Sequence, residues 1–165
     1  MEIQILRELL WSQFGGTVEM LQKAIQSCPA PVWNKENAQR QYWQIAFHAL
    51  FFLDLYLSGS RQAFRLPEPF KVVDVEGSGR KPEREYSREE LLGYAAYCRD
   101  KLITKLTELD EEHALQRCGF PWLNISVAEL FLYNMRHVQH HSAQLGLILR
   151  TEVNEGVPWV FKATG

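Results

Sequence analysis

Residues 134–144 read Asn-Met-Arg-His-Val-Gln-His-His-Ser-Ala-Gln and lie inside a long apolar run from Val127 to Leu149. The run is preceded by Ser-Val-Ala-Glu at 126–129, a capping box in which the serine hydroxyl and the glutamate carboxylate satisfy each other's free backbone N–H groups. This pattern predicts a helix from 127 to about 151, and that helix carries three of the five histidines of the chain.

The three histidines of this helix point in different directions. At about 100° per residue, His137 and His141 lie about 40° apart, one turn above the other. His140 lies about 60° to the other side of His137, and so about 100° from His141. Two imidazoles one turn apart can hold one metal ion, which leaves a choice between a 137/141 pair and a 137/140 pair. Arg136, beside His140, would repel a dication, so we favour His137 and His141 and regard His140 as a bystander.

Apolar residues recurring at spacings of three and four predict three further helices. Their ranges are 2–27, 37–57 and 88–109, and the last begins with a second capping box at Ser87-Arg-Glu-Glu90. Gly15 and Gly16 stand inside the first range, although each glycine lowers helix stability by about 1 kcal/mol relative to alanine. The pair indicates either a close helix contact or a kink.

The connection 61–86 contains three prolines and Gly77-Ser78-Gly79, which forbid a long helix. Connections of this length carry the chain back across a helix bundle, so helices two and three should run parallel. The tail Gly156-Val-Pro-Trp-Val-Phe is too apolar to hang free and should pack back on the bundle, where Trp159 and the crossover could wall a pocket. The prediction is an all-α four-helix bundle, with residues 1–165 as a single domain.

Composition argues against several classes of function. The chain has 165 residues, 46% of them hydrophobic, and a formal net charge of −2, which gives no reason to expect nucleic acid or an anionic membrane as partner. The most apolar run, Ile45 to Leu57, is too short to span a bilayer, and residues 1–30 do not form a signal peptide. We therefore expect a soluble cytoplasmic protein. Three cysteines without a Cys-x-x-Cys motif suggest neither a disulfide framework nor a zinc ribbon.

His48 is the natural third ligand. It is the only ionisable group on an otherwise apolar and amide face of the second helix. Three histidines leave a coordination position open, as catalytic zinc sites do, and neutral imidazoles suit zinc, nickel, copper and iron. The second ring nitrogen of each ligand needs an acceptor. Three amides, one or two turns from a ligand, are placed to serve: Gln44, Asn134 and Gln144.

No carboxylate lies on either inner face. Val138 stands where a zinc protease of the His-Glu-x-x-His type has its glutamate, so any chemistry would rely on the metal activating its own water or thiol. The alternative without a metal is that the histidines are hydrogen-bonded core residues. No catalytic residue beyond the metal ligands can be named.

The chain resembles the DinB/YfiT-like superfamily of metal-binding four-helix bundles over essentially its whole length. The likeness rests on His48 within His-Ala-Leu-Phe-Phe-Leu-Asp-Leu-Tyr-Leu, on His137, His141 and Gln144, and on the segments Tyr86-Ser-Arg-Glu-Glu-Leu-Leu and Leu132-Tyr-Asn-Met-Arg-His-Val-Gln. The resemblance implies an up-down-down-up bundle, often a homodimer, that binds zinc, nickel or a similar ion. Many members have Arg-Gly before the glutamine where this chain has Ser142-Ala143, which removes a cation beside the site.

Two hypotheses of function follow. Some relatives transfer low-molecular-weight thiols, so the resemblance supports a metal-dependent small-molecule enzyme, either a thiol S-transferase with such a thiol as co-substrate or a hydrolase. The alternative is a non-catalytic, metal-bound bundle that acts as a scaffold or interaction module in a stress response. The missing general base favours the second hypothesis, and the open coordination position favours the first.

Overall fold

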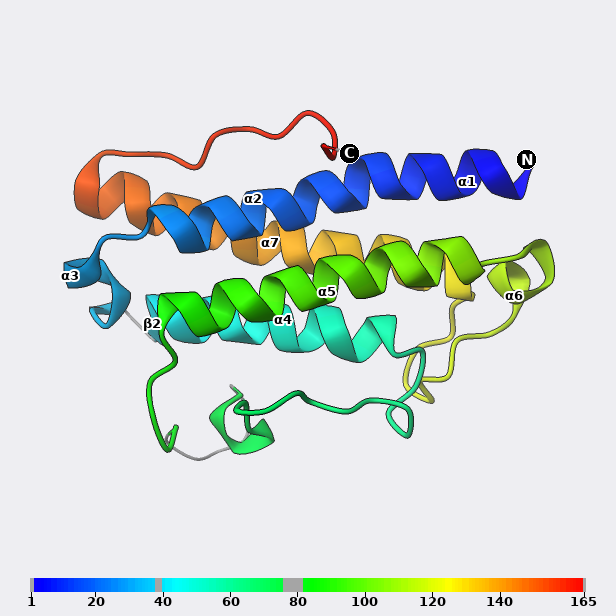
Figure 1. Cartoon of the computed structure of the whole chain (residues 1–165), viewed down its shortest axis with the longest axis horizontal. Coiled ribbons are helices and arrows are strands. Elements are labelled where there is room, and N and C mark those ends of the chain that lie inside the picture. The colour runs from blue at the N-terminus through cyan, green and yellow to red at the C-terminus, as the bar shows by residue number, and fades with distance from the viewer. Residues whose placement is uncertain (1, 38–39, 76–81, 165) are drawn as a thin grey trace.

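The computed structural model describes residues 2–37, 40–75 and 82–164 and is mostly helical, which confirms the all-α fold class (Figure 1). Its long elements are α1 (Ile3–Leu10), the π-helix η1 (Trp11–Gly15), α2 (Gly16–Ser27), α4 (Tyr42–Leu57), α5 (Arg88–Glu108) and α7 (Val127–Val153). Its short ones are α3 (Ala30–Trp33), the 3₁₀-helix η2 (Val72–Asp74), α6 (Glu111–Leu115) and the antiparallel strands β1 (Glu36–Asn37) and β2 (Arg40–Gln41).

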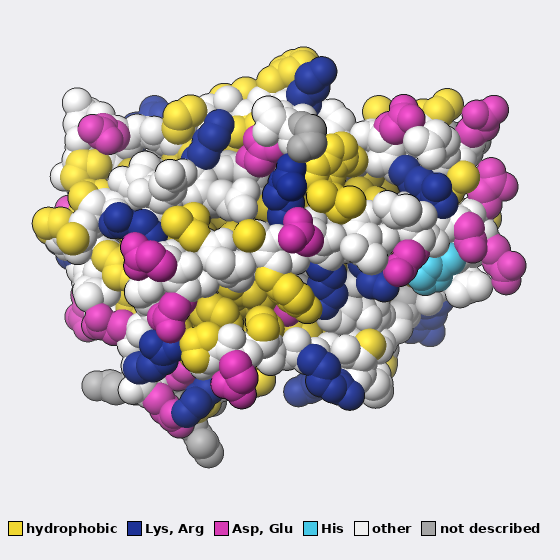
Figure 2. Space-filling view, in the orientation of Figure 1, with side chains coloured by type: hydrophobic (Ala, Val, Ile, Leu, Met, Phe, Trp, Pro, Cys, Tyr) yellow, Lys and Arg dark blue, Asp and Glu magenta, His cyan; other side chains and the backbone are white. Residues whose placement is uncertain are grey.

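The long helices enclose one core. α4 packs against α5 and α7, and α2 packs against the same two helices. The largest side chains at the centre are fully buried, namely Trp43, Tyr42, Tyr86, Phe14, Phe47 and Phe120. Within the described part of the chain, no helix is both long enough and apolar enough to cross a membrane. Figure 2 shows acidic and basic side chains intermixed over one face of the molecule.

The second predicted helix begins five residues later than expected, at Tyr42 instead of 37. Before it, β1 (Glu36–Asn37) pairs with β2 (Arg40–Gln41). The side chains of Gln41 and Gln44 then form a reciprocal capping box, which supplies partners for two backbone N–H groups that have none at a helix start. Gln41 is therefore the N-cap of α4 and not part of its inner face.

The glycine pair of the first helix is explained by the C-terminal tail. The backbone N–H of Ala163 donates to the carbonyl oxygen of Ser12, at 2.8 Å, within the π-helical segment. A Cβ atom at Gly15 would lie 2.7 Å from the Cβ atom of Ala163, and one at Gly16 would lie 3.3 Å from its backbone nitrogen. The sequence left open a close helix contact or a kink; the structure shows a close contact, which is made with the tail and not with another helix.

The tail does pack back on the helices, as expected, although not through its aromatic side chains. Trp159 is 73% exposed and Phe161 is 79% exposed. Thr164 anchors the end of the tail, because its backbone N–H and its hydroxyl both donate to Oε1 of Glu19, at 2.6 and 2.9 Å. These contacts follow the apolar segment 156–161, of which Val157 packs against the core.

Asp54 joins α4 to α5. Its side chain is fully buried, and its Oδ1 lies 2.5 Å from Nζ of Lys101. The hydroxyl of Tyr94 donates to its Oδ2 at 2.9 Å. One face of α4 is therefore fixed by an ion pair, while the opposite face is free to line a site against α7.

The connection between α4 and α5 is described on both sides of residues 76–81, so Gly77-Ser78-Gly79 lies outside the described residues. Asp74 accepts hydrogen bonds from the hydroxyl of Tyr86 and, at 2.7 Å, from the backbone N–H of Glu83. These bonds tie the two described arms of the connection together beside the start of α5.

Candidate metal centre

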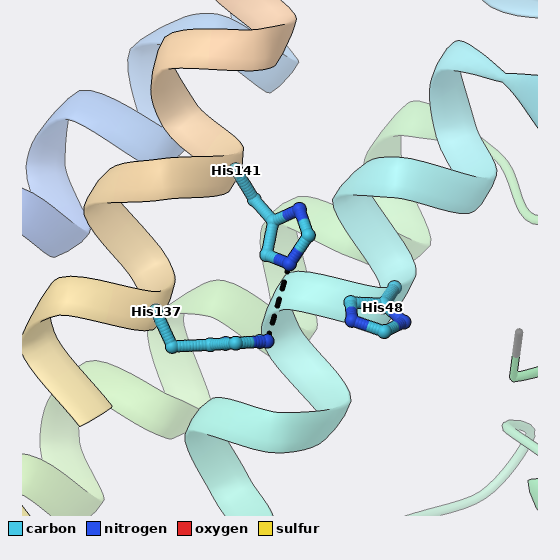
Figure 3. A group of neighbouring side chains, drawn as sticks. All are labelled: His48, His137 and His141. Atoms are coloured by element: carbon cyan, nitrogen blue, oxygen red, sulfur yellow. Dashed lines mark hydrogen bonds between the residues drawn. The ribbon is translucent and has the colours of Figure 1, made fainter. Parts of the chain in front are cut away.

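Three histidines converge between α4 and α7. His48 comes from the middle of α4, and His137 and His141 lie one turn apart on α7 (Figure 3). Each offers a ring nitrogen, and the three nitrogens lie within 4.8 Å of one another. The Nε2 atoms of His137 and His141 are 3.1 Å apart. The structure thus brings together the three residues that the sequence proposed as ligands.

The distance between the two histidines of α7 fits a divalent ion. Two nitrogen ligands about 2.0–2.1 Å from a tetrahedral ion lie roughly 3.3 Å from each other, which is close to the 3.1 Å between the two Nε2 atoms of α7. The donor set consists of imidazoles, which suit zinc, nickel, copper and iron. In the described part of the chain, no cysteine or carboxylate joins the cluster.

Gln144 fixes the orientation of His141. Its Oε1 lies 2.7 Å from Nδ1 of His141, one turn further along α7. Since an amide oxygen can only accept, Nδ1 of His141 carries the proton and the lone pair is left on Nε2, on the side of the cluster. A ligand histidine in metalloproteins is held in the same way, by an acceptor on its second nitrogen.

His137 lacks such an acceptor. Its Nδ1 is buried and has no hydrogen-bond partner among the described residues. Without a metal, its Nε2–H can donate to Nε2 of His141, whose lone pair is free. With a metal on Nε2, the proton must sit on Nδ1, where the described surroundings offer no oxygen. The protein thus stabilises the metal-binding tautomer of His141 through Gln144, whereas the metal-binding tautomer of His137 has no acceptor for its Nδ1 proton among the described residues.

Burial keeps the cluster neutral. It lowers the pKa of His48 to about 3 and that of His137 to about 4, because desolvation disfavours the imidazolium and the neighbouring histidines would repel it. The pKa of His141 is lowered by burial as well, partly opposed by its hydrogen bond with Gln144. Arg40 of β2 adds to the lowering for His48 and His141. At pH 7 the three rings therefore keep the lone pairs that a metal requires.

Aromatic side chains cover one side of the cluster. The ring of Phe52 lies 4.7 Å from that of His48 and 5.3 Å from that of His137, measured between centroids. Tyr56, one turn further along α4, is 6.4 Å from His137. These rings shield the imidazoles from water, which is the cause of the lowered pKa values.

The other residues considered from the sequence are Gln44, Asn134 and His140, of which the two amides form hydrogen bonds outside the histidine cluster. The Oε1 of Gln44 accepts from the backbone N–H of Gln41 at 2.9 Å, so it serves the helix cap. Nδ2 of Asn134 donates to the carbonyl oxygen of Leu53 at 3.1 Å. His140 is exposed, and its ring centroid lies 5.0 Å from that of His141. Of the three amides proposed as acceptors, Gln144 alone is seen to contact a ligand histidine.

Arg40 and Phe52 were not assigned to the site from the sequence. Arg40 falls in a segment predicted to be helical, so its position beside the cluster depends on the unforeseen hairpin. The spacing of four residues between His48 and Phe52 was a usable signal, because residues one turn apart on a helix are neighbours.

The fold and this cluster together define an all-α protein with a candidate three-histidine metal site. The family model of the DinB superfamily matches residues 13–145, a range that includes all three histidines. The chain belongs to the DinB superfamily. A comparison with curated proteins finds no match.

Proposed function

We propose that this DinB superfamily protein binds zinc or nickel through His48, His137 and His141 and is a metal-dependent enzyme acting on a small molecule. The observation that carries the proposal is the convergence of three neutral imidazoles within 4.8 Å of one another. With three protein ligands, a four-coordinate ion keeps one position for a water, a thiol or a substrate.

The proposed reaction is thiol S-transfer or hydrolysis. A divalent ion at this site would lower the pKa of a water or thiol and so supply a nucleophile near neutral pH. The residues of the chain have simpler roles. Gln144 orients His141, and Phe52 excludes water from the neighbouring imidazoles. A low-molecular-weight thiol is the proposed co-substrate of the transfer reaction.

The finer topology is also a proposal. We infer an up-down-down-up four-helix bundle with a crossover between α4 and α5. In Figure 1 the colour gradient runs in the same direction along α4 and α5, and in the opposite direction along α2 and α7, which supports this order. We further propose that the bundle is one domain and that it forms a homodimer. Light scattering would test the dimer.

A non-catalytic role is the second candidate. The cluster contains histidines alone among the described residues, so it provides no carboxylate to act as general base. A metal-bound scaffold needs none. The two functions share the metal and differ in turnover, which makes them separable by experiment.

Elemental analysis of untagged protein tests the shared premise. Wild-type protein should contain close to one equivalent of zinc or nickel, and His137→Ala should contain little. His113→Ala is the matched control, because His113 is exposed on α6 and lies outside the cluster. Circular dichroism should show unchanged helicity in both variants. Absence of metal from the wild type after growth with either metal would contradict both functions.

A screen of thiol-transfer and hydrolysis reactions separates the enzyme from the scaffold. The enzyme should lose turnover in His137→Ala and retain it in His113→Ala. Turnover that persists in metal-free His137→Ala would refute the enzymatic proposal. A metal-loaded wild type that is inactive throughout the screen would favour the scaffold.

A further inference from the structure

A cavity, separate from the histidine cluster, lies at the end of the molecule where α4 and α5 end and α7 begins. It measures about 110 Å³, and none of the three clustered histidines lines it. Its apolar wall is formed by Leu57, Leu109, Val127, Leu130 and Phe131. An engineered apolar cavity of roughly 150 Å³ binds benzene, so this cavity suits a ligand about the size of a single six-membered ring.

Asn134 is the buried polar group of this cavity. It is 1% exposed and lies among the lining residues. Its Nδ2 donates to the carbonyl oxygen of Leu53, but its Oδ1 is buried and accepts no hydrogen bond from the described residues. Buried acceptors are nearly always satisfied, so an unpartnered one beside a cavity indicates a missing donor.

The electrostatic surroundings also favour a donor. α4 ends at Leu57 and α5 at Glu108, and both residues line the cavity, so the partially negative ends of two helices meet there. The opposing N-terminus of α7 is occupied by its own capping box. A ligand with an N–H or O–H donor therefore suits the cavity better than a ligand that can only accept hydrogen bonds.

The charges around the opening of the cavity do not favour a charged ligand. The exposed lining residues with ionisable side chains are Glu108, His113 and Arg117. Glu108 is paired with Lys105, whose Nζ lies 2.7 Å from its Oε2. Figure 2 shows further acidic side chains at the end of the molecule that carries α6. Charges of both signs thus surround the opening, and a neutral molecule meets the least conflict.

We propose that this cavity binds a small neutral molecule with a ring-sized apolar body and one hydroxyl or amino group, which donates to Oδ1 of Asn134. The site is distinct from the histidine cluster. Tyr56 stands between them, since it lines the cavity and its ring centroid lies 6.4 Å from that of His137. Phenol and toluene are matched probes, because they have nearly the same shape and differ in the donor.

The test is a titration of metal-free, full-length protein, followed by NMR. Phenol should bind roughly five- to tenfold more tightly than toluene, the ratio expected for one net hydrogen bond. The amide signals that shift should be those of lining residues such as Leu109, Gly119 and Leu130. Equal affinity for the two probes, no binding of either, or shifts centred on the histidines would overturn the proposal.

Two variants locate the interaction. Asn134→Leu should reduce phenol affinity to that of toluene while toluene still binds, because the acceptor is lost and the apolar wall remains. Leu130→Trp should fill the cavity and abolish binding of both. Leu132→Trp is its control, since Leu132 is 47% exposed on the same helix and does not line the cavity. Undiminished phenol binding in Asn134→Leu would contradict the assignment, and the wild-type NMR map stands if Leu130→Trp does not fold.

Discussion

The Oε1 of Gln144 lies 2.7 Å from Nδ1 of His141 and thereby leaves the lone pair of that imidazole on Nε2, 3.1 Å from Nε2 of His137. An uncharged amide thus determines which nitrogen of a candidate ligand faces the cluster. His137, one turn away, receives no comparable support from the described residues.

Replacing Gln144 should weaken metal binding without unfolding the protein. Loss of the acceptor on a ligand histidine lowers metal affinity by about 10- to 100-fold in other sites, and we expect Gln144→Ala to fall in that range. Gln144→Glu should bind at least as well as wild type, because its carboxylate also accepts from Nδ1. Competition with a chromophoric chelator measures the affinities. Equal affinity in Gln144→Ala and wild type would show that the hydrogen bond does not orient the ligand.

Stability of the metal-free protein should fall as the pH drops below about 6.5. An unfolded histidine titrates near 6.5, whereas burial lowers the pKa of His48 to about 3 and that of His137 to about 4. Between these values and 6.5 the unfolded chain binds protons that the folded chain does not, so the free energy of unfolding decreases as the pH falls. Above 6.5 both states are neutral and the contribution disappears.

The expected loss is about 1–2 kcal/mol between pH 7 and pH 5, after allowance for the solvent that screens these partly exposed rings. Urea denaturation at the two pH values measures it. His137→Gln should show a flatter dependence, because one of the three clustered histidines no longer titrates. A stability that is unchanged or rises toward pH 5 would mean that the histidines are not held neutral.

The contact between Gly15 and the tail can be tested by a compensating pair. Gly15→Ala adds a Cβ that would lie 2.7 Å from the Cβ of Ala163 and 3.0 Å from the ring of Trp11. Despite the better helix propensity of alanine, it should destabilise the protein by roughly 1–2 kcal/mol and expose the tail to limited proteolysis. Ala163→Gly in the same chain should recover part of the loss. Additive effects of the two substitutions would show that they do not meet.

Asp54 should affect stability and not metal content. Asp54→Asn leaves the Lys101 ammonium, 17% exposed, opposite a neutral amide. We expect a loss of about 3 kcal/mol, the lower end of the range for breaking a buried ion pair. The double replacement Asp54→Leu with Lys101→Met should be more stable than Asp54→Asn, because no unpaired charge remains. A large loss of bound metal in a folded Asp54→Asn protein would show that the two faces of α4 are coupled.

Much of the fold could be predicted from local sequence patterns. The capping boxes at Ser87 and Ser126 place the starts of α5 and α7 correctly, because a reciprocal cap depends on residues three apart. The start of α4 was misplaced, because residues 36–37 and 40–41 pair as β1 and β2, and a two-residue strand has no periodicity to detect. The glycine pair signalled a close approach, but its partner, Ala163, is too distant in the chain for any local pattern to identify.

The sequence by itself reduced the ligand pair of α7 to 137/141 or 137/140, since 100° per residue is a property of the helix alone, and Arg136 favoured His137 with His141. It could nominate His48 but not bring it within 4.8 Å of the other two, because that distance depends on how α4 packs against α7. The tertiary structure likewise decided that Gln144 is hydrogen-bonded to His141, that Gln44 caps α4 and that Asn134 lines a cavity separate from the histidine cluster. Side-chain hydrogen bonds form over a few ångströms, and only the packed helices fix positions that closely.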